Sequence, residues 1–265
     1  MTEWTVAEPQ VLEIDEPVTS LAVRIVAGHV DVVTTDASTC RVEVTEVENE
    51  PLLVSVDDGV LTIRHDRLSW DGLLGWLRSE RRRAVVSVAV PASCSARIGV
   101  VSASAVVAGL EGPVTVRCVS GEVVLDGVEG PVEVESVSGD VEGRGLRGRL
   151  SLKSVSGGLT VVDGPADIRA ESVSGDVALD LMPLAKVDID VATVSGDVTV
   201  RLPSDAGLRV DVASTSGDLA CAFPGVSLDK KPGRRKISGS VGDGTGALHG
   251  RTVSGRVALL SRGPA

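Results

Sequence analysis

The sequence predicts an all-β protein, namely a single-domain parallel β-solenoid with about 18–22 residues per coil and an irregular, β-rich N-terminal cap. Three observations lead to this prediction. The chain repeats the tetrapeptide Val-Ser-Gly-Asp, it contains many valines and 30 glycines, and it has one Phe, three Trp and no Tyr. Valine favours strands and glycine favours tight turns, and a core of small aliphatic side chains must be thin.

The repeat is anchored by a Ser-Gly dipeptide that recurs along the second half of the chain. The first four of its glycines are equally spaced, the next three intervals are somewhat longer, and the last is shorter. Self-similarity of this kind is the signature of a solenoid. We predict that these glycines turn the chain, with positive φ, once in each coil. They are Gly121, Gly139, Gly157, Gly175, Gly196, Gly217, Gly239 and Gly255.

Alignment on the glycine gives columns with physical meaning. The apolar columns two residues before and two residues after it predict inward-facing side chains. Three residues before it the column is mostly Ser or Thr, so Cys118 is interpreted as a small residue and not as a nucleophile. Four before it, Arg117, Glu135, Lys153 and Glu171 alternate in sign, which favours adjacent strands in register because opposite charges attract across a sheet.

The Asp of the tetrapeptide recurs as Asp140, Asp176, Asp197 and Asp218, and a ladder of carboxylates is a candidate calcium site. Gly158, Ser240 and Arg256 interrupt this column, however, so no metal site is predicted. We expect the Ser and Asp side chains to hydrogen-bond the backbone of their own turn.

The chain divides into an irregular β-rich part, residues 1–98, and the regular repeat, residues 99–265. The first part contains a predicted hairpin with its turn at Asp58-Gly59. It also contains a basic insertion, residues 64–83, in which apolar side chains follow helical spacing. We expect the insertion to cover an open end of the solenoid, to bind a protein partner or to lie on an anionic membrane. Its candidate binding residues are Trp70, Leu73, Leu74, Trp76, Leu77, Arg78, Arg81, Arg82 and Arg83.

A second basic segment lies within the longest complete repeat, where a solvated turn is expected. The alternative is a contact with an anion or an acidic partner. Its basic residues are Lys230, Lys231, Arg234, Arg235 and Lys236.

Composition narrows the function classes. The net charge of −11 argues against nucleic acid as a partner, because binding to phosphates needs an excess of cations. Four cysteines without CxxC spacing predict a reducing compartment. No basic region followed by an apolar stretch starts the chain and no long apolar run is present, so we expect a cytoplasmic protein, with the inner membrane face as the alternative.

Catalytic motifs are missing from the sequence. His29, His65 and His249 are scattered outside any metal-ligand or triad motif, and no phosphate loop or dinucleotide fingerprint occurs. A carbohydrate cleft normally has aromatic platforms, which this composition does not supply. We therefore predict no catalytic residues, no metal and no cofactor.

Three features together resemble the bacterial adhesin-type β-strand-repeat family, also called toastrack domains. They are the segment VAGHVDV at 26–32, the segment AVVSVAVP at 84–91 and the serial Val-Ser-Gly-Asp-Val repeats. The resemblance implies a β-solenoid without known catalytic residues. It also implies, for some relatives, membrane segments and a link to envelope stress.

The leading hypothesis is a non-catalytic scaffold that binds a protein partner through its charged sheet faces and the insertion, with self-association at the solenoid ends. The alternatives are a peripheral cell-envelope stress component that binds anionic membrane or a membrane partner through residues 64–83, and a surface adhesin. A carbohydrate-active enzyme is the least favoured.

Overall fold

The computed structural model describes residues 2–37, 39–65, 82–182, 186–231 and 234–263. These residues form 24 β-strands, and none of them is helical. No helix in this part of the chain is long and apolar enough to cross a membrane. The contacts divide the chain into unit 1, Met1–Val134, and unit 2, Glu135–Ala265. The fold is the predicted all-β solenoid.

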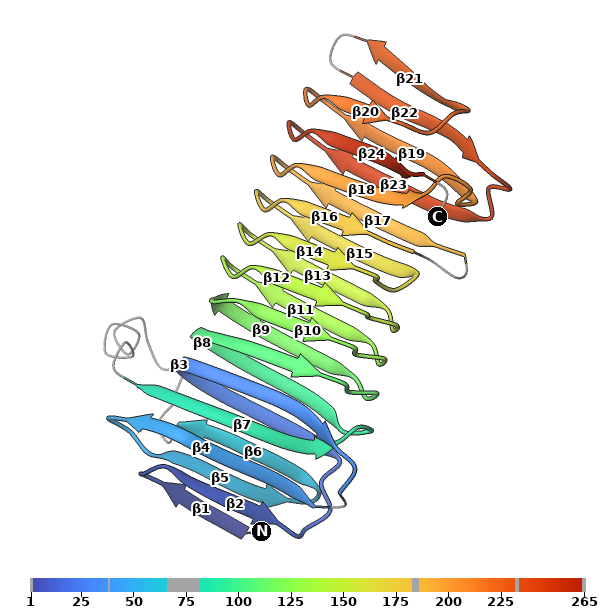
Figure 1. Cartoon of the computed structure of the whole chain (residues 1–265). Coiled ribbons are helices and arrows are strands. Elements are labelled where there is room, and N and C mark those ends of the chain that lie inside the picture. The colour runs from blue at the N-terminus through green and yellow to red at the C-terminus, as the bar shows by residue number, and fades with distance from the viewer. Residues whose placement is uncertain (1, 38, 66–81, 183–185, 232–233, 264–265) are drawn as a thin grey trace. The chain divides into compact units, whose positions relative to one another are not determined.

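Unit 1 combines antiparallel strands at its N-terminal end with parallel coils after them (Figure 1). Its strands are β1 (Thr2–Val6), β2 (Gln10–Ile14), β3 (Ser20–Thr35), β4 (Cys40–Glu48), β5 (Leu52–Asp57), β6 (Val60–His65), β7 (Arg83–Pro91), β8 (Ser95–Ala108), β9 (Val114–Ser120) and β10 (Val123–Asp126). Strand β11 (Val132–Ser136) spans the boundary between the units.

Strand β3 turns a corner between Arg24 and Ala27, where its partner on one edge changes from β6 to β7 while β8 pairs with it on both sides of the corner. Ser20–Arg24 pair with β6, and Ala27–Thr35 pair with β7. At the corner the consecutive residues Ile25 and Val26 are both buried, which breaks the strand alternation of inward and outward side chains. Gly28 follows with φ +116°, and a Cβ there would lie 1.9 Å from the carbonyl oxygen of Ala84.

The predicted hairpin at Asp58-Gly59 is confirmed. Strands β5 and β6 pair antiparallel, and the two turn residues have φ +47° and +73°. This is the conformation that a two-residue hairpin turn with strand-matching twist requires.

Most strands of unit 2 form a stack of parallel coils in register. Its strands are β12 (Val141–Arg144), β13 (Leu150–Ser154), β14 (Leu159–Val162), β15 (Asp167–Ser172), β16 (Val177–Asp180), β17 (Asp188–Thr193), β18 (Val198–Pro203), β19 (Leu208–Ser214), β20 (Leu219–Cys221), β21 (Val226–Lys231), β22 (Arg234–Val241), β23 (Gly246–Thr252) and β24 (Val257–Arg262). Lys153 lies opposite Glu171 on the next coil, so the predicted coil length and charge pairing are confirmed there.

The coils of unit 2 do not stack in sequence order. Strand β23 pairs with β17 on one side and with β19 on the other. Strand β24 likewise lies between β18 and β20 (Figure 1). The last coil of the chain, β23 and β24, therefore lies between the coil formed by β17 and β18 and the coil formed by β19 and β20.

The basic segment forms a hairpin, which corrects the prediction of a turn within a coil. Strands β21 and β22 pair antiparallel, and β22 also pairs antiparallel with β19. Gly239 consequently lies inside β22, opposite Val210, and does not turn the chain. The sequence contained one indication that this copy of the repeat is not a coil. Lys236 stands in the column that holds Ser or Thr in neighbouring copies, and a lysine cannot be buried there as those small residues are.

The other repeat glycines of unit 2 are needed for a close approach between coils. A Cβ on Gly157 would lie 2.0 Å from the carbonyl oxygen of Gly139, and one on Gly175 would lie 2.0 Å from that of Gly157. Gly196, Gly255 and Gly217 continue the column in that spatial order. Among the turn glycines of the repeat only Gly121 has a positive φ, of +130°. The prediction of a positive φ is therefore wrong for the other turn glycines. Glycine is needed at those positions because a Cβ would overlap the adjacent coil.

We expect Gly157→Ala to destabilise the protein by about 1 to 3 kcal/mol, because the new methyl group overlaps the backbone of the adjacent coil. Urea denaturation measures the loss. Gly158→Ala is the matched control, since its Cβ would meet its nearest neighbours at 3.5 Å. Equal losses in the two variants would contradict the steric role.

Candidate functional site

Five valines of unit 2 form an exposed row at the Ser-Gly turns, which we call the valine stripe. They stand two residues before the repeat glycine, where the sequence predicted inward-facing side chains, and each is between 47% and 49% exposed. That prediction is wrong for this column. In spatial order the stripe consists of Val137, Val155, Val173, Val194 and Val253.

The buried Ser/Thr column explains why these valines face outward. Ser136, Ser154, Ser172, Thr193 and Thr252 are at most 8% exposed and directly precede the stripe residues. Successive side chains of a strand point to opposite faces, so burial of the small hydroxyl residue sends the valine to solvent. The column two residues after the glycine is buried, as predicted.

The buried hydroxyls bind the glycine of their own turn. Ser136 Oγ donates to the carbonyl of Gly139 at 2.7 Å, and Ser154 Oγ donates to that of Gly157 at 2.8 Å. In the next coil Ser172 Oγ accepts from the N–H of Gly175 at 2.9 Å. These bonds satisfy polar groups where water does not reach.

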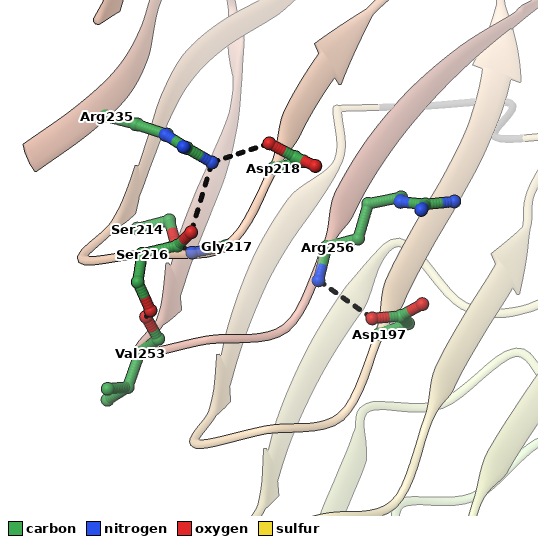
Figure 2. A network of polar contacts seen from close by, with 8 residues as sticks. All are labelled: Asp197, Ser214, Ser216, Gly217, Asp218, Arg235, Val253 and Arg256. Atoms are coloured by element: carbon green, nitrogen blue, oxygen red, sulfur yellow. Dashed lines mark hydrogen bonds and ion pairs between the residues drawn. The ribbon is translucent and has the colours of Figure 1, made fainter.

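The Ser and Asp of the tetrapeptide instead bind the neighbouring coil, which corrects the expectation of bonds within their own turn. Ser156 Oγ donates to the carbonyl of Val137 at 3.2 Å. Asp140 Oδ1 accepts from the N–H of Gly158 at 2.8 Å. Figure 2 shows the same two contacts farther along, from Ser216 to Val253 and from the N–H of Arg256 to Asp197.

These contacts give the Asp column a structural role. Each of Asp140, Asp176 and Asp197 accepts a backbone N–H of the next coil at 2.8 Å. Within the described residues no group of three or more His, Cys, Asp or Glu side chains could hold a metal ion.

The charged sheet faces of unit 2 carry ion pairs within and between coils. Arg149 lies 2.7 Å from Asp167 on the next coil, and Arg169 lies 2.8 Å from Glu171 on the same strand. Each of these side chains is more than 40% exposed, and exposed pairs contribute little to stability. Each of these four charged side chains therefore has a partner of opposite charge.

Most of the basic insertion lies outside the described residues, and so do the candidates Trp70, Leu73, Leu74, Trp76, Leu77, Arg78 and Arg81. The two candidates that are described form ion pairs within unit 1. Arg82 pairs with Glu50, and Arg83 Nε lies 2.8 Å from Glu46. These two guanidinium groups thus have acidic partners inside the fold.

The basic hairpin is tied to the coil beside it. Arg235 Nη1 donates to Asp218 at 2.6 Å and to the carbonyl of Ser216 at 3.1 Å (Figure 2). Lys236 lies 3.0 Å from Asp211, and Lys231 lies 3.0 Å from Asp229.

Neither the thiols nor the imidazoles of the described residues form a catalytic arrangement. Burial raises the pKa of Cys118 to about 11, which suits a structural thiol and not a nucleophile. His29 Nε2 contacts Asp31 at 2.8 Å on the same strand. His65 is fully buried and has no hydrogen-bond partner among the described residues.

The model of the family described as Toastrack DUF4097 matches residues 18–259 of this chain. A solved structure of a putative lipid binding protein from Parabacteroides distasonis is 16% identical, with 96% of this chain and 97% of that chain covered and a TM-score of 0.56. A putative adhesin from Parabacteroides merdae is 9% identical, with 96% and 97% covered and a TM-score of 0.40. A putative cell adhesion protein from Clostridium sporogenes is 14% identical, with 96% and 100% covered and a TM-score of 0.30. The comparison with curated proteins gives no match.

We expect Asp176→Ala to destabilise the protein by about 1 to 2 kcal/mol, because it leaves the N–H of Asp197 without its acceptor. Asp176→Asn should recover much of the loss, since its amide oxygen can accept the same bond. Thermal unfolding of both variants tests this. Equal losses for Ala and Asn would contradict the assigned hydrogen bond.

The burial of His65 predicts a pH dependence of stability. Burial lowers the pKa of His65, and Arg82 adds to this effect while Glu50 opposes it. Below about 6.5, the ordinary pKa, the unfolded chain binds a proton that the folded chain does not. Stability should therefore fall as the pH drops through that range.

Urea denaturation as a function of pH measures this decline, which His65→Leu should reduce. His29→Gln is the control, because it removes a histidine that is partly exposed, and it should leave the decline in place. A decline of unchanged slope in His65→Leu would contradict the role of His65.

Proposed function

Because this chain belongs to the Toastrack DUF4097 family, we propose that it is a non-catalytic β-solenoid scaffold that binds a protein partner along the valine stripe. The family match covers residues 18–259, nearly the whole chain. The observation that carries the proposal is the stripe itself, five half-exposed valines on successive coils.

The stripe suits binding because it is apolar and held in place by its surroundings. With neighbouring coils about 4.8 Å apart, five residues extend over roughly 19 Å. Complete burial of a valine side chain is worth about 1.5 to 3 kcal/mol, and roughly half of it remains to be gained at each position. Hydrogen bonds on both sides hold the turns, for example from Ser174 to Val155 and from Ser195 to Val173, so binding requires little ordering.

Charge at the same turns indicates the chemistry of the partner. Asp140, Asp176 and Asp197 are exposed three residues after stripe valines. A segment that places apolar side chains on the valines and Lys or Arg beside the carboxylates complements this surface in shape and charge. We therefore propose an extended protein segment with apolar and basic residues as the partner.

A photo-reactive residue at position 155 or 173 tests the proposal in the native cell. We expect the same protein to be crosslinked from both positions and not from position 162, where Val162 is 44% exposed but lies outside the stripe. Val155→Lys combined with Val173→Lys should weaken the complex by roughly tenfold or more, while the free energy of unfolding changes by about 0.5 kcal/mol or less.

Crosslinking that is equal at positions 155 and 162, or unaffected by the double substitution, would contradict a stripe-dependent partner. Flotation of the protein with anionic liposomes at low salt distinguishes the other class of target. Co-flotation that depends on the stripe would show that it binds lipid, and the proposed protein partner would then be wrong.

A further inference from the structure

Each unit ends in a strand with an unpaired edge, and the two ends carry opposite charge. In unit 1, β1 pairs with β5 alone and β2 with β4 alone among the described strands. In unit 2, β21 pairs with β22 alone by the same measure. Unpaired edges present N–H and C=O groups that can add a strand from another chain.

The end formed by β1 and β2 is acidic. Residues 2–16 contain five carboxylates and no Lys or Arg, and four of the five acidic residues are exposed. Val11, on β2, is 45% exposed. The acidic residues of this end are Glu3, Glu8, Glu13, Asp15 and Glu16.

The end formed by β21 and β22 is basic. Residues 226–241 contain five Lys or Arg and a single acid, Asp229, which gives a net charge of +4 against −5 at the acidic end. Leu228 on the edge strand is 41% exposed. Both ends therefore combine an open strand edge, an exposed aliphatic side chain and a net charge, which is negative at one end and positive at the other.

From this complementarity we propose that the protein self-associates head to tail, with the acidic end of one copy adding to the basic end of the next. Strands β1 and β2 have five residues each and β21 has six, so the edges match in length. Like charges oppose contact between two acidic ends or two basic ends. The contact is heterologous and does not close by two-fold symmetry, so association continues beyond a dimer unless the copies form a ring.

This inference does not depend on the valine stripe, which lies at the turns of unit 2 and is unchanged in every variant below. Its basis is the two strand edges and their charges. The pairs of Lys231 with Asp229 and of Glu13 with Arg41 are exposed, and such weak pairs can be exchanged for contacts with a second copy.

Sedimentation velocity over a wide range of concentration measures the association. The wild-type chain should form oligomers larger than a dimer at low salt, and about 1 M salt should weaken them because the Debye length falls to about 3 Å. Glu3→Lys with Glu8→Lys reduces the net charge of the acidic end from −5 to −1. Lys230→Glu with Lys231→Glu reduces the net charge of the basic end from +4 to 0. Each double variant alone should lose at least about tenfold in association constant.

An equimolar mixture of the two double variants should recover one-to-one association, because the unchanged basic end of the first variant then meets the unchanged acidic end of the second. Glu129→Lys with Glu133→Lys is the matched control, since it makes the same charge change as the acidic-end variant at exposed positions outside residues 2–16 and 226–241, and it should associate like wild type. A wild-type chain that stays monomeric, charge substitutions without effect, or a mixture that does not recover would each overturn the proposal.

Discussion

The approach of each repeat glycine to the carbonyl of the glycine in the adjacent coil is the constraint on which unit 2 depends. A methyl group on Gly157 or Gly175 would lie 2.0 Å from a backbone oxygen, so the turns can stack at sheet spacing only without side chains there. Once they stack, the neighbouring hydroxyl and carboxylate reach the next coil, as Ser156 and Asp140 do. The tetrapeptide is therefore an intercoil contact as much as a turn.

The same constraint shapes the surface available for binding. A tight turn leaves room inside only for a small residue, which is Ser154 in one coil, and the next side chain, Val155, must face solvent. Because the same turn recurs in five coils, the outward-facing valines form a row of apolar side chains along one edge. The Ser and Asp side chains beside the row form hydrogen bonds with the adjacent coil, as Ser156 and Asp140 do.

The sequence predicted the solenoid, the coil length and the pairing of Lys153 with Glu171, because these follow from a period that is visible in the residues. The prediction that the column of Val155 faces inward was wrong. An apolar residue beside a turn can face either side of the sheet, and only the burial of the adjacent Ser154 shows that Val155 faces solvent. It also could not give the position of the last coil, because the spacing between glycines states how long a coil is and not which coil it lies beside. In the column of small residues three before the glycine, Lys236 was the one residue too large and too polar to be buried there.

The stacking order of unit 2 tests the account most directly, because the glycine contacts run from Gly196 to Gly255 and then to Gly217, with the last coil in between. Thr199 and Ala220 both lie opposite Ala258, from either side. Both variants carry Ser in place of Cys221. Mild oxidation should form a disulfide when cysteines stand at positions 199 and 258. It should form none when they stand at positions 199 and 220, because an intervening strand separates their Cα atoms by more than the limit of roughly 7 Å for a disulfide. A disulfide between positions 199 and 220 instead would show that the coils stack in sequence order and would contradict the account.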